Sequence, residues 1–170
     1  VTSPSGRAAA IKTREIAEQQ GVKTAVSFSD PGMVEFFRDG MAEIVGDGVD
    51  LVFCNEAEAL GWGQTDQLEV AVERLKQVAK SFVITRGAEG AITFDGEQRV
   101  EIPPHRVQAV DSNGAGDMFA GAFLYAITRG EDFSTAGRFA SLAAGKIVAN
   151  YGPRLPAADY PALRAEFFGD

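Results

Sequence analysis

The most informative stretch of the sequence covers residues 110–125 and reads Val-Asp-Ser-Asn-Gly-Ala-Gly-Asp-Met-Phe-Ala-Gly-Ala-Phe-Leu-Tyr. The apolar residues 107–110 predict the end of a strand. Apolar residues with helical spacing continue from Met118 to Ile127 and predict a helix. The Gly-Ala-Gly between these elements leaves backbone N–H groups uncovered at the positive end of the helix dipole. The stretch therefore predicts an anion site at the start of a helix.

Asp117 is unexpected beside such a site, because a carboxylate repels a phosphate. One task explains it: Asp117 could accept the proton of an attacking hydroxyl group while the N–H groups hold the transferred phosphoryl group. The alternative is structural, since an aspartate in the first turn of a helix offsets the dipole and caps an N–H. A Gly-Ala-Gly sequence alone is also more often a tight turn, so these residues by themselves leave both interpretations open.

Composition limits the class of protein. The chain has 170 residues, which is enough for about one domain with a substantial core, and we expect a single domain over residues 1–170. Its 24 acidic and 16 basic residues give a formal net charge of −8, which disfavours nucleic acid as a partner. No apolar run approaches the roughly 20 residues that span a bilayer, so we expect no membrane partner.

The N-terminus and the rare residue types favour the cytoplasm. The first six residues lack the charged and apolar regions of a signal peptide. Cys54 is the only cysteine, so no internal disulfide can form, which suits a cytoplasmic location. His105 is the only histidine, which leaves no cluster for a zinc site, and we expect it at the surface.

Strand and helix patterns alternate along the chain and predict an α/β fold. Ser3 and Pro4 predict the start of the first helix and Gly21 its end. The expected helices cover residues 5–20, 33–45, 66–80, 118–127, 131–150 and 160–168. The expected strands cover residues 22–28, 51–54, 82–85, 91–94 and 99–102, the last two joined by an Asp95-Gly96 hairpin turn.

Polar residues follow the buried strand predicted at residues 51–54. Ligands of open α/β sheets gather at the carboxyl ends of strands, and Asn55 with Glu58 could hold a hydrated Mg2+ there. The other interpretation is a capping box, in which Asn55 caps a helix and Glu58 returns the bond. The spacing alone favours the capping box.

Two further patterns also allow two interpretations each. Thr85, Gly87 and Gly90 by themselves predict a simple glycine hairpin, and Arg86 between them reaches a phosphate or lies solvated at the surface. Small residues from Ala140 to Gly145 allow close approach of a flat adenine base or of a neighbouring helix.

Together these motifs resemble the ribokinase-like, or PfkB, family of sugar and nucleoside kinases. The run Asp-Ser-Asn-Gly-Ala-Gly-Asp at residues 111–117 resembles the family's C-terminal signature. The similarity continues along nearly the whole chain in the family's order, and the adenosine-kinase-like branch is the most similar subgroup. The resemblance implies a Rossmann-like layered α-β-α sheet and transfer of the ATP γ-phosphoryl group to a primary hydroxyl of a sugar or nucleoside.

The resemblance also implies roles for individual residues. Asp117 is the base, and the anion hole consists of Gly114, Ala115 and Gly116. Mg2+ lies near Asn55 and Glu58 and is held through water. A monovalent cation such as K+ is implied near Asp111 and Asn113. The implied ATP contacts are Asn55, Thr85, Gly87, Gly90, Ser141 and Gly152.

One departure from the family pattern concerns length. Family members are longer, and their N-terminal half carries the sugar-contacting residues and a small β-sheet lid that have no counterpart here. We therefore expect a partial ribokinase-like fold, the C-terminal ATP-binding half. A sheet begun in the missing half would leave open edges and exposed apolar faces, which favours aggregation or oligomers such as a homodimer.

Two other functions compete with a kinase. A nucleotide-binding module without catalysis is compatible with the sequence, because the ATP motifs are present and the acceptor pocket is mostly missing. An NAD-binding Rossmann domain is disfavoured, because no Gly-x-Gly-x-x-Gly follows a first strand with an acidic residue about 20 positions later.

Overall fold

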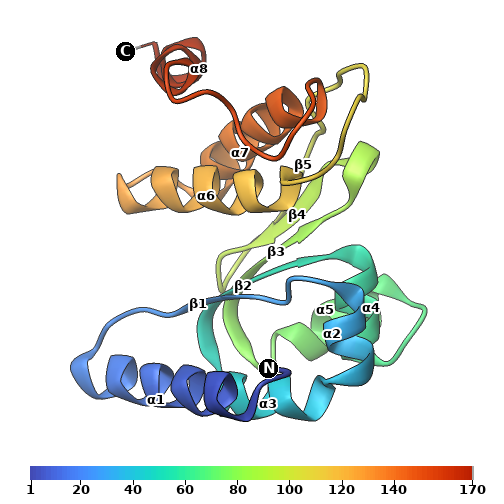
Figure 1. The fold of residues 1–170 in the computed structure, drawn as a ribbon, viewed down its shortest axis with the longest axis vertical. Helices are drawn as coiled ribbons and strands as arrows, with labels where there is room; N and C mark the ends of the chain where they lie inside the picture. The colour runs from blue at the N-terminus through green and yellow to red at the C-terminus, as the bar shows by residue number, and fades with distance from the viewer. Residues whose placement is uncertain (170) are drawn as a thin grey trace. The chain divides into compact units, whose positions relative to one another are not determined.

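The computed structural model describes residues 1–169 and confirms the α/β class (Figure 1). Its strands are β1 (Ala25–Ser27), β2 (Val49–Asn55), β3 (Ala79–Thr85), β4 (Ala91–Phe94) and β5 (Arg99–Ile102). Its helices are α1 (Pro4–Gln20), α2 (Pro31–Phe36), α3 (Arg38–Val45), α4 (Glu56–Gly63), α5 (Leu68–Leu75), α6 (Ala115–Thr128), α7 (Phe133–Val148) and α8 (Asp159–Phe168), with a short 3-10 helix η1 (Gly87–Glu89). The chain folds as two compact units, residues 1–85 with 94–98 and residues 86–93 with 99–169.

The strands form a five-stranded sheet in the order β1-β2-β3-β4-β5. β1, β2 and β3 run parallel, and the register pairs Val49 with Ala79 and Asn55 with Thr85. Parallel strands need crossover connections, which α2 with α3 and α4 with α5 supply. β2 and β3 are buried along most of their length, which explains their nearly continuous apolar sequences.

Helix α1 confirms the predicted first helix and its caps. The Ser3 hydroxyl accepts a hydrogen bond from the Gly6 N–H, Pro4 begins the helix, and Gly21 ends it in the left-handed conformation with φ 66°. All its residues are exposed or half-buried. α1 packs beside α3, where Arg14 Nε donates to the Ile44 carbonyl at 2.8 Å (Figure 1).

The core of the first unit lies where the crossover helices meet the parallel strands. Aromatic side chains are among the largest in this core, and the ring centroids of Phe28 and Trp62 are 5.0 Å apart. Phe82 stacks on Phe94 at 5.1 Å. The fully buried aliphatic residues of this core include Val34, Val45, Val52, Val72, Leu75, Val83 and Ile84.

Several predicted boundaries were wrong. The helix expected over residues 33–45 is broken at Phe37, whose φ of −127° leaves the helical region, so α2 and α3 are separate. The helix expected over residues 66–80 ends at Leu75, because the pairing of Ala79 with Val49 draws that segment into β3. The strand expected over residues 22–28 is shorter than predicted and consists of β1, Ala25–Ser27.

The strand expected at residues 107–110 is also absent from the described chain. The N–H groups of Val110 and Asp111 instead both donate to the Val148 carbonyl at the end of α7, at 2.8 and 3.2 Å. This segment therefore ends against a helix rather than in the sheet.

The second unit is organised around the neighbouring helices α6 and α7 (Figure 1). Phe123 of α6 meets Phe133 of α7 edge-on, with centroids 4.9 Å apart. Gly137 of α7 lies so close to β5 that an added Cβ would stand 2.6 Å from Ile102 Cγ1. Within residues 1–169, no helix is both long enough and apolar enough to cross a bilayer.

Two glycines before β4 allow a matched test of this fold. Both have positive φ, but a Cβ on Gly90 would lie 2.0 Å from the Ile102 carbonyl oxygen, whereas a Cβ on Gly87 would meet no described heavy atom within 4 Å. We expect Gly90→Ala to lower the free energy of unfolding by about 2–5 kcal/mol, because it adds a backbone clash to the strain of the left-handed conformation. Gly87→Ala should cost only about 1–2 kcal/mol. Urea denaturation measures both, and equal losses would contradict the packing at Gly90.

Candidate active site

Polar residues follow each of the three parallel strands in the first unit. Asp30 lies just beyond β1 and caps α2, since its Oδ1 accepts from the Gly32 N–H at 2.8 Å. Asn55 ends β2 and caps α4, and Thr85 ends β3. The register pairs Asn55 with Thr85, so the structure brings these two predicted ATP contacts side by side.

Asn55 and Glu58 form the capping box that the sequence offered as one interpretation. The Asn55 side-chain oxygen accepts from the Glu58 N–H at 2.8 Å. Glu58 Oε2 accepts from the Asn55 N–H at 2.9 Å, and Oε1 accepts from Asn55 Nδ2 at 2.8 Å. The box fixes the orientation of the carboxylate, and each of its oxygens keeps a lone pair for a further partner.

Glu58 is unusual because it is a carboxylate with only 4% of its surface exposed. Burial raises its pKa, the N–H of Asn55 opposes that shift, and the negative charge of Asp30 adds to it. A buried acid with a perturbed pKa at the carboxyl edge of a parallel sheet is a candidate functional group.

The second unit holds the glycine loop at the start of α6. Gly114 is the N-cap residue and adopts the left-handed conformation with φ 77°. The Ala115 N–H donates to the Ser112 carbonyl at 3.2 Å, and the Met118 N–H donates to Gly114 at 2.9 Å. A Cβ on Gly116 would meet no heavy atom of the described residues within 4 Å. The first turn of α6 is therefore open, and Asp117 within it is exposed.

A second loop, residues 151–155, meets the glycine loop. Asp111 Oδ1 accepts from the Asn113 N–H at 3.0 Å, and Oδ2 accepts from the Gly152 N–H at 3.1 Å. These two donors lower the pKa of Asp111. A Cβ on Gly114 would lie 2.3 Å from the Pro153 carbonyl oxygen. The structure thus brings together Asp111, Asn113, Gly114 and Gly152.

The Ser141 hydroxyl group accepts one hydrogen bond and donates another, both within the protein. Its Oγ accepts from the His105 N–H at 2.8 Å and donates to the Pro103 carbonyl at 3.0 Å. A Cβ on Gly145 would lie 2.8 Å from His105 Cδ2. The small residues of α7 therefore allow the segment 103–105 to pack against the helix, and His105 itself is exposed as expected.

The remaining predicted residues lie in the turn between β3 and β4. Gly87 and Gly90 both have positive φ, at 55° and 87°. Arg86 pairs with Glu89, and its Nη1 lies 3.4 Å from Glu101 Oε2. The Arg86 side chain is only 20% exposed and pairs with two carboxylates, so it is not the freely solvated arginine of the surface interpretation.

Two features of the site were missed from sequence. Ser29 has φ 72°, an uncommon conformation for a residue other than glycine, directly before Asp30. The Ser-Asp-Pro sequence after a strand was a usable signal for a cap at Asp30. The contact of Pro153 with Gly114 had no local signal, because it joins segments far apart in the chain.

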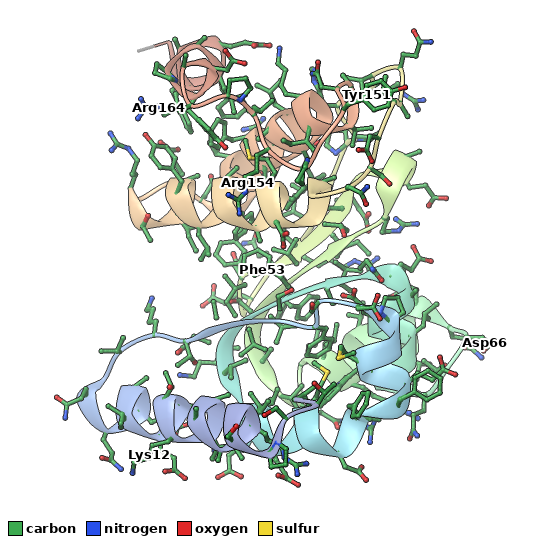
Figure 2. All side chains as sticks on the ribbon, viewed as in Figure 1. Lys12, Phe53, Asp66, Tyr151, Arg154 and Arg164 are labelled. Atoms are coloured by element: carbon green, nitrogen blue, oxygen red, sulfur yellow. The ribbon has the colours of Figure 1, made fainter. Side chains whose placement is uncertain are left out.

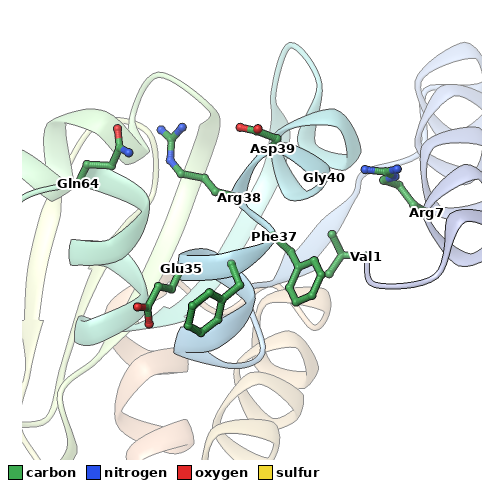
Figure 3. Close-up of a pocket in the computed structure, with 9 residues that line it drawn as sticks. Val1, Arg7, Glu35, Phe37, Arg38, Asp39, Gly40 and Gln64 are labelled. Atoms are coloured by element: carbon green, nitrogen blue, oxygen red, sulfur yellow. The ribbon is translucent and has the colours of Figure 1, made fainter.

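An open pocket of about 380 Å3 lies elsewhere in the first unit (Figure 3). Its lining includes Arg7, Glu35, Phe36, Arg38, Asp39 and Gln64, so it is separate from the predicted site residues. Within the described chain, His, Cys, Asp and Glu side chains form no group of three that could hold a metal ion.

The chain belongs to the pfkB family of carbohydrate kinases, whose family model matches residues 1–159. It is 27% identical over 161 residues to an adenosine kinase of Saccharomyces cerevisiae, covering 87% of this chain and 47% of that protein. The resemblance to the PfkB family is therefore confirmed.

Solved structures extend this comparison to the fold. The chain is similar to a probable sugar kinase protein from Rhizobium etli CFN 42, with 34% identity and a TM-score of 0.86 over 95% of this chain and 49% of that one. It is also similar to an adenosine kinase from Sinorhizobium meliloti, with 32% identity and a TM-score of 0.86 over 93% of this chain and 49% of that one. The chain spans about half the length of these relatives.

The raised pKa of Glu58 predicts how stability depends on pH. The folded state binds this proton more tightly than the unfolded state, whose reference pKa is 4.5. The contribution of Glu58 therefore favours folding below pH 4.5 and is lost as the pH rises through the raised pKa. Glu58→Gln is neutral throughout, so the wild type should lose stability relative to this variant as the pH rises above 4.5. The slope should reach at most about 1.4 kcal/mol per pH unit and flatten once the raised pKa is passed. Urea denaturation at several pH values measures the difference, and a difference independent of pH would refute the assignment.

Proposed function

We propose that this chain carries the ATP-binding and phosphoryl-transfer machinery of a kinase that acts on a primary hydroxyl of a sugar or nucleoside. The observation that carries this proposal is the start of α6, where an open glycine turn and an exposed carboxylate occupy the first turn of one helix. Membership of the pfkB family, with adenosine and sugar kinases among the relatives, supports the reaction class and the acceptor class.

Asp117 is the proposed base. It accepts the proton of the acceptor hydroxyl as that oxygen forms a bond to the γ-phosphorus, while the bond from the γ-phosphorus to the bridging oxygen breaks and ADP leaves. The exposure of Asp117 leaves it accessible to an acceptor.

The N–H groups of Gly114, Ala115 and Gly116 are the proposed anion hole. One donor of this kind is worth about 2.7–4 kcal/mol in the transition state. The Ala115 N–H already donates to Ser112 at 3.2 Å, so it would have to share or exchange that partner. A Cβ on Gly116 would meet no described heavy atom within 4 Å, whereas a Cβ on Gly114 would meet Pro153, so Gly116 is the more open of the two glycines.

Asn55 and Glu58 fit a hydrated Mg2+. Mg2+ usually keeps several waters and uses one or two carboxylates together with substrate phosphates. The buried Glu58 carboxylate retains free lone pairs, and its hydrogen-bond donors from Asn55 are neutral groups. Its negative charge therefore fits such an ion held through water. When bound, Mg2+ neutralises charge on the ATP phosphates. Asp111 and Asn113 are the proposed residues near a monovalent cation, although both Asp111 oxygens already accept N–H groups.

The proposed nucleotide contacts are Thr85, Gly87, Gly90 and Gly152. Ser141 contributes to the same site indirectly, because its hydroxyl group holds the segment 103–105 against α7. Its role is therefore to support the nucleotide site.

A nucleotide-binding module without catalysis is the second candidate function. One observation favours it: the chain spans about half the length of its relatives. In this case ATP binds but no acceptor is phosphorylated by this chain.

Two glycines of α6 allow a matched test of the anion hole. A Cβ on Gly116 or on Gly121 would meet no described heavy atom within 4 Å, so alanine should fold at both positions. We expect Gly116→Ala to weaken Mg-ATP binding at least about tenfold, because the methyl group covers N–H groups that would bind a charged phosphate. Gly121→Ala, further along the same helix, should leave the affinity unchanged. Isothermal titration measures both, and equal affinities for the two variants would remove the anion hole from this turn.

The acceptor reaction is tested by ADP release from Mg-ATP with adenosine, inosine, ribose, fructose and 2-keto-3-deoxygluconate. We expect Asp117→Ala to lower kcat about 10^2–10^4-fold and to leave ATP affinity nearly unchanged, because the base acts only in the transfer step. Asp159→Ala is the control, since Asp159 is also an exposed aspartate in the first turn of a helix.

Comparable turnover by Asp117→Ala and wild type would show that Asp117 is not the base. ATP binding without turnover of any acceptor by the wild type would favour the non-catalytic module.

A further inference from the structure

The loop at residues 151–155, Tyr-Gly-Pro-Arg-Leu, is assigned only the Gly152 contact in the function proposed above. One carboxylate ties this loop to the glycine loop. Asp111 accepts the Asn113 N–H through one oxygen and the Gly152 N–H through the other, at 3.0 and 3.1 Å. The position of the loop is therefore linked to the residues that lead into α6.

A second contact places the loop directly against the start of α6. The position that a Cβ would take on Gly114 lies 2.3 Å from the Pro153 carbonyl oxygen and 2.7 Å from the Pro153 Cα. Only a residue without a side chain allows this approach. Pro153 is therefore in contact with the backbone of the N-cap residue of α6.

Arg154 follows Pro153 and is brought to the same place. Consecutive Cα atoms are about 3.8 Å apart, so the Cα of Arg154 also lies near Gly114. Arg154 is exposed (Figure 2), and its guanidinium group makes no hydrogen bond or ion pair with the described residues. No partner among the described residues therefore holds its long flexible side chain away from the start of α6.

The charges of the two loops indicate that this side chain can attract a phosphate. Residues 111–117 and 151–155 contain three charged groups, Asp111, Asp117 and Arg154. Two are acidic and would repel a phosphate, so Arg154 is the only cation that these segments can offer to one. A guanidinium group matches phosphate oxygens with two parallel hydrogen bonds.

We propose that Arg154 binds the phosphate group held at the start of α6, and that Asp111 and Pro153 position it there. The proposal rests on the function proposed above for the identity of the anion. A solvated arginine without this role would act only through weak, screened electrostatics, as any exposed arginine of the chain would.

The experiment measures the affinities of tripolyphosphate and of Mg-ATP by isothermal titration. We expect Arg154→Gln to weaken both at least about tenfold, the loss of a hydrogen bond to a charged group. Arg154→Lys should retain part of the affinity, because it keeps the charge and loses the two-pronged geometry. The control is Arg129→Gln, which removes the same charge at the other end of α6, about 20 Å away at 1.5 Å per residue; its affinities should stay within about twofold of the wild type.

The positioning role of Asp111 is tested by a double-mutant cycle. We expect Arg154→Gln to weaken tripolyphosphate binding much less in an Asp111→Ala background than in the wild type, because the loop is then no longer held. Effects that simply add would overturn the positioning role. Thermal denaturation of each variant confirms that it is folded.

Equal effects of Arg154→Gln and Arg129→Gln, or no effect of either, would overturn the binding role of Arg154. A wild-type chain that binds neither tripolyphosphate nor Mg-ATP would overturn both this inference and the proposed function. Tripolyphosphate binding that depends on Arg154, together with no phosphoryl transfer to any acceptor, would refute the kinase function and still support the inference.

Discussion

Parallel pairing of β1, β2 and β3 is the constraint from which the first unit follows. Each strand must start at the same end of the sheet, so the chain has to return by a crossover after every strand. The crossovers begin where the strands end, and their helices need caps at that edge. Asp30 and Asn55 meet that need, and Glu58 completes the cap on α4. A polar edge is thus a consequence of strand direction before any ligand is considered.

Two helix starts, that of α4 in the first unit and that of α6 in the second, are built in opposite ways. At α4 a side chain caps the helix, and its reciprocal partner is a buried carboxylate whose oxygens are fixed in direction. At α6 the N-cap is Gly114, which has no side chain, and the neighbouring loop is held by a carboxylate outside the helix. Under the proposed function, the fixed carboxylate of the first arrangement suits a hydrated cation, and the uncapped helix start of the second suits an anion.

Local signals in the sequence predicted the elements that local interactions fix. The Ser3 cap with Pro4, the Asn55–Glu58 box and the Asp95-Gly96 turn each depend on residues within a few positions of one another, and all three form. The start of β3 at Ala79 depends on pairing with Val49, and the docking of Pro153 depends on Gly114. Such contacts between distant segments leave no periodic pattern in the sequence, so the sequence analysis did not predict them. The hydroxyl partners of Ser141 were missed for the same reason.

The separation of β2 from β3 by two helices has a consequence for how the chain folds. Only residues 129–132 lie between α6 and α7, so these helices meet after a short loop closes, whereas β2 must wait for a much longer segment to close before it pairs with β3. Pairing over long sequence separation is slow, because the entropy of loop closure is lost before contacts repay it. During synthesis β2 emerges before β3, and its apolar residues stay without their strand partner until the crossover is complete. β2 is therefore open to pairing with another chain for as long as that crossover is incomplete.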